Sequence, residues 1–397
     1  MIEANENTFS NQPGYQLVVE QNELPSLVQR WLQKRVVAID TEFMRTSTYF
    51  AKPGLIQIAD DDAVYIIDPV EVTDLRPLAE LLASDNTIKV MHSMSEDIEL
   101  LFYATGVKAE AVFDTQVAAA FLGYGPSLGY QPLVLEVLGI ELDKSETRSD
   151  WLKRPLTASQ LEYAAKDAEY LLLVFHKLES ELKLKNFLTA VYDEVAFTIA
   201  QAMEVWTEPE NAYLKLRGGW ELSTESQKLL KCLVMWRDEL AIEQNIPKPW
   251  IFNDNLLIKI VEEKPINPNQ LKNLKGMQFK SLRQFGELLM QQLAAFEGGA
   301  DETDGFILID KPVKGLEQDL FKKLKKVITD VAAQSGIAAQ LLGSRKMLEQ
   351  FVIHSYRHRR PQLPSAYQGW RKDFVGNEIL AVIHAVISVE TGLKEKK

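Results

Sequence analysis

Two acidic residues at positions 40 and 42 have the type and spacing needed to hold a divalent cation. Asp40 and Glu42 follow a short apolar run, Val36 to Ile39. Because side chains alternate along a strand, we expect both carboxylates on one face and Thr41 on the other. Carboxylates side by side at a buried strand end repel each other, and a cation would neutralise them. A lone D-x-E is more often an ordinary strand end with hydrated acids, so this pair does not establish a metal site by itself.

A further acid, Asp97, lies where a predicted strand gives way to a helix, in the stretch His92-Ser93-Met94-Ser95-Glu96-Asp97. Ser93 or Ser95 is the predicted N-cap of that helix. Acids in a first helical turn are favoured by the helix dipole, so Glu96 and Asp97 also have a purely structural explanation.

A tyrosine and an aspartate, Tyr163 and Asp167, are four residues apart in a predicted helix. That spacing places them on the same helix face, with the phenol one turn from the carboxylate. Tyr170 and Leu171 share this face, so a buried structural tyrosine is the alternative.

Apolar runs and helical periodicity predict the elements that must position these residues. The expected strands are Val36–Ile39, Leu55–Ala59, Val64–Ile67, Ile88–Met91 and Glu110–Phe113, with the second and third forming a hairpin. The expected helices are Leu75–Leu82, Glu96–Tyr103, Thr115–Leu122 and Ser159 to about Leu182. Strands first and alternation afterwards indicate a mixed sheet flanked by helices.

The second half of the chain has helical periodicity only. A small, acidic and turn-rich stretch, Phe296 to Gly305, is the predicted linker, and a last helical block runs from Leu316 to Gly392. We therefore predict three domains, at 1–205, 218–298 and 306–397.

Composition limits the classes of protein to consider. Of the 397 residues, 46% are hydrophobic, which is enough for several cores, and the net charge is −12. This charge argues against coating nucleic acid through a basic surface, although an enzyme that gathers carboxylates around cations can be acidic overall.

Cysteine content and hydropathy bear on the compartment. The single cysteine, Cys232, excludes an internal disulfide and a cysteine-based zinc site, and its apolar surroundings predict a buried core thiol. Residues 1–15 are polar, without the apolar segment of a secretory signal, and no stretch approaches the length of a membrane span. We expect a cytoplasmic protein.

The combination of Asp40, Glu42, Asp97, Tyr163 and Asp167 is a far more specific sequence pattern than any one of these residues. In this order they resemble the DEDD exonuclease superfamily in its tyrosine-bearing form, whose fold is similar to ribonuclease H. Flanking stretches carry the same resemblance: Asp40-Thr41-Glu42-Phe43 with Arg45-Thr46, Gly54-Leu55-Ile56-Gln57, Ser95-Glu96-Asp97, Asp114-Thr115-Gln116, and Asp143-Lys144-Ser145-Glu146 before Asp150-Trp151. The helical modules resemble helicase-and-RNase-D C-terminal (HRDC) domains, so residues from about 15 to 370 resemble the bacterial ribonuclease D family.

The resemblance implies an α/β plus all-α protein, a ribonuclease H-like nuclease domain followed by two HRDC-like helical bundles. It implies that Asp40, Glu42, Asp97 and Asp167 bind two divalent ions, Mg²⁺ or Mn²⁺, and an all-oxygen set suits Mg²⁺. It also implies 3′→5′ release of nucleoside 5′-monophosphates from single-stranded RNA ends, including those of tRNA precursors. Tyr163 would orient or deprotonate the attacking water. Because the ordinary tyrosine pKa is about 10, we favour orientation.

Other residues are weaker candidates for the site. Phe43 and Met44 follow the acidic pair and are candidates for packing on a terminal base, although packing into the core is the alternative. His92 is a candidate for contact with substrate, although an internally hydrogen-bonded histidine is more common. Asp114 is the predicted cap of the helix that begins at Thr115.

Basic residues stand out in the acidic C-terminal block: Lys322, Lys323, Lys325, Lys326, Arg345, Lys346, Arg357, Arg359 and Arg360. A charge run is usually a solvated helix face, but the resemblance to HRDC domains makes contact with phosphates the other reading. Tyr356 and Trp370 lie nearby and are candidates for base stacking, with core packing favoured for Trp370.

Two other functions stay open at this level. A DNA-directed exonuclease of the same superfamily would have the same acids, although no polymerase-like region follows. A catalytically silent RNA-binding scaffold would have no need for all four acids and the tyrosine. We expect a monomer without membrane association, since no heptad seam is apparent.

Overall fold

The computed structural model describes residues 14–143, 145–296, 306–360 and 362–394. Most of the N-terminal segment, which we predicted not to be a secretory signal, lies outside the described residues. So does the predicted linker after Phe296. The described chain forms two compact units, the first from residues up to 44, 52–202 and 313 onward, and the second from 45–51 and 203–312.

A mixed six-stranded sheet in the order β1-β4-β3-β2-β5-β6 is the framework of the first unit. The strands are β1 (Gln16–Val18), β2 (Val36–Met44), β3 (Lys52–Ala59), β4 (Val64–Ile67), β5 (Ile88–Met91) and β6 (Val112–Asp114). Strands β2, β3 and β4 pair antiparallel, whereas β5 is parallel to β2 and β6 is parallel to β5. The predicted strands and hairpin are therefore confirmed. The sequence did not predict β1, which is three residues long and mostly exposed, so its pattern is weak.

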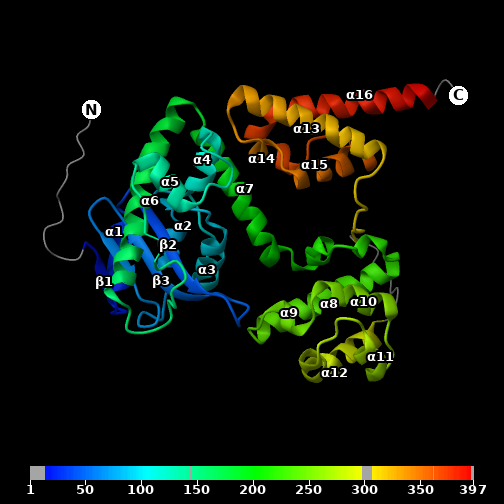
Figure 1. Cartoon of the computed structure of the whole chain (residues 1–397), viewed down its shortest axis with the longest axis horizontal. Coiled ribbons are helices and arrows are strands. Elements are labelled where there is room, and N and C mark those ends of the chain that lie inside the picture. The colour runs from blue at the N-terminus through cyan, green and yellow to red at the C-terminus, as the bar shows by residue number, and fades with distance from the viewer. Residues whose placement is uncertain (1–13, 144, 297–305, 361, 395–397) are drawn as a thin grey trace. The chain divides into compact units, whose positions relative to one another are not determined.

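Helices precede, connect and follow the strands of this unit (Figure 1). They are α1 (Glu23–Trp31), α2 (Leu78–Ala83), α3 (Ser95–Thr105), α4 (Thr115–Leu122), α5 (Tyr130–Leu138), α6 (Ala158–Leu184) and α7 (Leu188–Thr207), the last of which belongs to this unit up to residue 202 and to the second unit from 203.

The two faces of the sheet are covered by different helices. Residues paired across strands point to the same face, so Ile39, Ile58 and Tyr65 form one row. This row faces α1, where Trp31 packs edge-to-face on Tyr65 with ring centroids 5.3 Å apart. The opposite row contains Asp40, Gln57 and Ile66 and faces α6, which packs against β2, β3 and β4. Burial on both faces explains why the strands read as continuous apolar runs.

The last part of the first unit is helical, as predicted. It consists of α13 (Leu316–Ser335), α14 (Ala339–Leu342), α15 (Arg345–Phe351), the π-helix η3 (Val352–Arg357), the 3₁₀ helix η4 (Ser365–Tyr367), the π-helix η5 (Lys372–Gly376) and α16 (Asn377–Lys394). It packs on the nuclease part: Ala338 N donates to Ala120 O (3.2 Å), and the Trp370 ring lies 4.7 Å from that of Phe121. Trp370 is buried, which confirms the core packing favoured for it.

The second unit is a helical bundle. Its helices are η1 (Pro209–Lys215), η2 (Gly219–Glu221), α8 (Thr224–Glu243), α9 (Lys248–Ile251), α10 (Asp254–Glu263), α11 (Pro268–Asn273) and α12 (Phe279–Ala295). Residues 45–51, between β2 and β3 in sequence, belong to this unit: Phe50 stacks on Trp206 at 5.7 Å, and its N–H donates to Asn245 Oδ1 (3.1 Å).

The expectation of a buried Cys232 is wrong, because this thiol is exposed on α8. Leu229, Leu230, Leu233 and Val234 form the buried side of that helix, and Cys232 falls outside it. None of the described helices is long and apolar enough to cross a membrane.

Candidate active site

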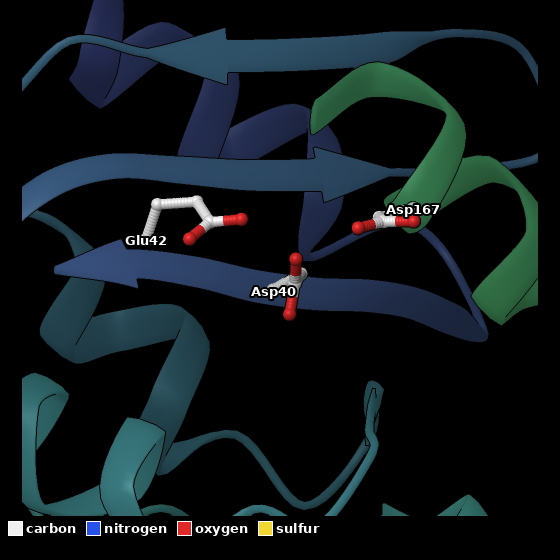
Figure 2. A group of neighbouring side chains, drawn as sticks. All are labelled: Asp40, Glu42 and Asp167. Carbon is white, nitrogen blue, oxygen red and sulfur yellow. The ribbon is translucent and has the colours of Figure 1, made fainter. Parts of the chain in front are cut away.

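Three carboxylates meet where β2 passes under α6. Asp40 and Glu42 on β2 and Asp167 on α6 each offer an oxygen, and these oxygens lie within 4.8 Å of one another. Figure 2 shows the three side chains directed into a common space. The alternation of the strand places Asp40 and Glu42 together, and the helix brings Asp167 to them from a position more than a hundred residues later.

Asp97, the fourth acid, comes from α3 and contacts β2 through Thr41. Thr41, which alternates with Asp40 and Glu42, donates a hydrogen bond from Oγ1 to the Asp97 carboxylate. Asp97 is outside the group of three oxygens, yet it is electrostatically linked to it: Asp40 raises the pKa of Asp97, and Asp97 raises that of Glu42. Asp40 therefore interacts electrostatically with both Asp97 and Asp167.

All four carboxyl groups have raised pKa values, and burial is the largest cause in each. The pKa is raised to about 8 for Asp40, about 9 for Glu42, about 8 for Asp97 and about 7 for Asp167. Repulsion from Asp167 adds to the shift of Asp40. Partly or fully buried acids that disfavour one another's charge become stable as carboxylates when a cation lies among them. An all-oxygen donor set fits Mg²⁺ or Mn²⁺.

The Tyr163 phenol is part of this arrangement. It hydrogen-bonds to the Asp167 carboxylate one turn away and to the Thr147 side chain, and burial raises its pKa far above the ordinary value. A phenol held neutral in this way donates a hydrogen bond and does not act as a base. The geometry thus agrees with orientation as the role of Tyr163.

The segment that contains Trp151 and Arg154 packs against Tyr163. The buried Trp151 ring lies 6.1 Å from the Tyr163 ring. Arg154 connects this segment to the sheet, because its Nε donates to Asp68 Oδ2 (2.7 Å) and its Nη2 to Gly54 O (2.9 Å). Gly54 is needed there, since a Cβ would lie 2.7 Å from that of Trp151. The sequence prediction quoted Gly54 and Trp151 only as part of a resemblance and assigned no role to Arg154.

Asp114 caps α4, as predicted, and it does more. Its Oδ1 accepts from Gln116 N (2.7 Å), Val117 N (3.3 Å) and Ser93 N (3.1 Å), and its Oδ2 accepts from Met94 N (3.0 Å). The predicted serine cap of α3 is wrong: α3 begins at Ser95, and its N-cap Met94 makes no side-chain cap bond. Ser93 has a φ of +55°, and Asp114 satisfies the amides of this turn in its place.

The weaker candidates have the following surroundings. His92 Nδ1 lies 2.9 Å from Thr115 Oγ1, its ring packs 5.3 Å from that of Tyr130, and burial lowers its pKa, which favours the neutral form. Phe43 and Met44 are partly exposed at the end of β2. Tyr130, which the sequence prediction missed, donates its hydroxyl to the backbone carbonyl of Asp167 and so supports α6 at the site.

A cavity of about 240 Å³ lies beside Tyr163 and Asp167. Its lining combines acidic, basic, aromatic and aliphatic side chains: Ile140, Glu141, Leu142, Asp143, Ser145, Ser159, Glu162, Tyr163, Lys166, Asp167 and Tyr170. Of the four carboxylates, Asp167 is the one that lines this cavity.

The basic residues of the C-terminal block differ in their surroundings. Lys323, Lys325 and Lys326 are exposed on α13. Arg357, in contrast, forms a two-point ion pair with Glu317, with Nε–Oε1 2.8 Å and Nη2–Oε2 2.6 Å. Tyr356 is buried, with the Arg359 guanidinium 5.0 Å from its ring centre. Arg357 and Tyr356 thus have structural partners, whereas the lysines of α13 are accessible.

Comparison with protein families gives three matches along the chain. The 3′-5′ exonuclease family matches residues 15–183, the HRDC domain family matches 226–293, and the family of ribonuclease D C-terminal HRDC domains matches 318–379. The first match contains all four carboxylates and Tyr163.

Relatives of similar length match nearly all of this chain. Ribonuclease D of Pseudomonas paraeruginosa is 33% identical over 377 residues, which are 95% of this chain and 100% of that protein. Ribonuclease D of Escherichia coli K12 is 33% identical over 371 residues, or 92% and 97% of the two chains. The crystal structure of E. coli RNase D matches with a TM-score of 0.84 at 32% identity, covering 94% of this chain and 99% of that one.

Proposed function

The chain belongs to the ribonuclease D family of 3′→5′ exoribonucleases, and we propose that it hydrolyses RNA 3′ ends with two divalent ions held by Asp40, Glu42, Asp97 and Asp167. The observation that carries this proposal is the meeting of three carboxylate oxygens within 4.8 Å, with Asp97 linked electrostatically to them. Bound cations supply charge neutralisation, activation of a water and stabilisation of the leaving oxygen.

The residues of this chain have distinct parts in the reaction. Asp40, Glu42, Asp97 and Asp167 would hold the ions, and Asp40 interacts electrostatically with both Asp167 and Asp97. Tyr163 stays protonated and orients the attacking water through its hydroxyl, while Thr147 and Asp167 fix the direction of that hydroxyl. The nucleotide being removed lies in the cavity beside Tyr163, and Phe43, Met44 and His92 are the proposed contacts of the RNA end. Nucleoside 5′-monophosphates are the proposed products.

The test is a time course on a 5′-labelled RNA with a single-stranded 3′ extension in Mg²⁺. Wild type should shorten it stepwise, and both EDTA and Asp40→Asn should abolish shortening. Asp85→Asn, at an exposed acid outside the carboxylate group, is the matched control and should act as wild type. Asp40→Asn with wild-type rate would overturn the assignment of this ligand.

The substrate is the finer part of the proposal. The solved E. coli relative is described as an exoribonuclease involved in structured RNA processing, which supports tRNA precursors with 3′ trailers as substrates of this chain. A purified precursor should lose its trailer residue by residue and then resist further shortening at the acceptor stem. Equal rates on matched DNA would favour the DNA-directed alternative, and binding without shortening would favour a silent scaffold. Monomeric state and cytoplasmic location stay predictions from the sequence.

A further inference from the structure

Gln57 is a fully buried polar residue in the middle of β3. Its relative exposure is 0%, and its neighbours Leu55, Ile56, Ile58 and Ala59 are apolar with exposures of at most 1%. Neither amide atom, Nε2 or Oε1, has a hydrogen-bond partner among the residues that the structure describes. An unpaired buried polar group destabilises the folded state, so folding alone would favour an apolar residue here.

The position of Gln57 places this amide next to the strand that carries Asp40. Gln57 pairs directly with Asp40 on the neighbouring strand, so the two side chains lie on the same face of the sheet. Directly opposed residues have Cβ atoms about 4.5–5.5 Å apart. Asp40 is directed from that face into the space it shares with Asp167 (Figure 2). The unpaired amide therefore lies on the same face of the sheet as the Asp40 carboxylate, in the row covered by α6.

We propose that Gln57 is a positioning residue of the metal site, whose amide would donate a hydrogen bond to the ionised Asp40 carboxylate and accept one from water at the site. An amide offers both a donor for a carboxylate oxygen and an acceptor for water protons, and it adds no charge to an already acidic site. Groups that orient metal ligands in this way typically contribute 10–100-fold to metal affinity or activity. The inference rests on the proposed function, because it requires that the carboxylates bind divalent cations.

The test compares Gln57→Met with wild type in two measurements that need no RNA. Calorimetric titration with Mn²⁺ should show affinity about 10–100-fold weaker in the variant. Thermal unfolding in EDTA should show a melting temperature equal to or above that of wild type, because an unpaired amide has been replaced by an apolar chain of similar size. Gln57→Leu serves if the methionine variant does not fold.

Gln227→Met is the matched control. Gln227 is also buried, but both of its amide atoms are engaged: Nε2 donates to Leu222 O (3.2 Å), and Oε1 accepts from Ile309 N (2.8 Å). This variant should melt at a lower temperature and bind Mn²⁺ as wild type does.

Two failures are distinguishable. Unchanged Mn²⁺ affinity in Gln57→Met, with wild type binding normally, overturns the role of Gln57 and leaves the proposed function intact. A wild-type protein that neither binds Mn²⁺ nor shortens RNA overturns the proposed function and this inference with it.

Discussion

Tyr163 and the four acids show how neighbours set the chemistry of single side chains. The phenol is bonded to Asp167 and Thr147, and its pKa is raised by burial, so it keeps its proton. We expect Tyr163→Phe to lower kcat by about 10²-fold, the size of effect typical when a reacting group loses its positioning, and to leave Mn²⁺ affinity unchanged. Single-turnover RNA hydrolysis and calorimetry measure the two effects. A near-wild-type kcat would show that the hydroxyl does not orient the water.

The carboxyl groups make metal-free stability depend on pH. Their pKa values of about 7 to 9 exceed the ordinary value of about 4, so the folded protein binds more protons than the unfolded one between these limits. Stability in EDTA should therefore fall as pH rises from 5 to 8. Mg²⁺ should raise the melting temperature more at pH 8 than at pH 6.

A control isolates the site from other titrating groups. Asp40→Asn removes one buried acid and relieves its neighbours, so its melting temperature in EDTA should fall less steeply with pH than that of wild type. Identical slopes for the two proteins would contradict the origin assigned to the effect.

At the scale of elements, Asp114 fixes two helix starts with one carboxylate. It accepts from the amides of Gln116 and Val117 at α4 and from those of Ser93 and Met94 just before α3, which carries Asp97. Loss of one cap costs about 0.5–2 kcal/mol, so Asp114→Ala should lower the free energy of unfolding by roughly twice that range. It should also lower kcat, because Asp97 loses its fixed position.

The comparison for this variant is Ser223→Ala, which removes the single cap of α8 in the other unit. It should cost stability in the one-cap range and leave kcat unchanged. Urea unfolding gives both free energies, and equal losses in the two variants would rule out the double role of Asp114.

At the scale of the whole molecule, a buried ion pair joins the C-terminal helices to the nuclease part of the first unit. Arg371 Nη2 lies 2.5 Å from the Glu194 carboxylate on α7, which also accepts from Trp370 Nε1 (3.2 Å). Arg371→Met leaves Glu194 buried without its cation and should cost about 3–5 kcal/mol. Adding Glu194→Gln should recover part of this loss.

An exposed ion pair on α15 provides the control for the Arg371 variant. Arg345 and Glu349 form an ion pair on the surface of α15, with Arg345 largely exposed. Arg345→Met should change the free energy of unfolding by at most about 1 kcal/mol. Denaturant unfolding of wild type, Arg371→Met, the Arg371→Met/Glu194→Gln double variant and Arg345→Met measures these free energies. If Arg371→Met lowered the free energy of unfolding as little as Arg345→Met does, the ion pair would not join the two parts.

The order of the main strands and helices could be predicted from the sequence, since apolar runs and helical periodicity are local. The four acids and Tyr163 were candidates from their spacing along β2, α3 and α6, which has a recognisable pattern, and of these the structure brings the oxygens of Asp40, Glu42 and Asp167 together. The same local logic missed β1, which is short, and misassigned Cys232 and the cap of α3, where the pattern allowed two readings.

The partners of these residues depend on the tertiary structure. Thr41 meets Asp97 56 residues later, and Arg154 meets Asp68 86 residues earlier. The unpaired amide of Gln57 is a candidate for a role at the site only because strand register places Gln57 opposite Asp40. Such contacts depend on register and on how helices pack across a sheet. Residue periodicity does not encode either, because it records which face is buried and not what lies against it.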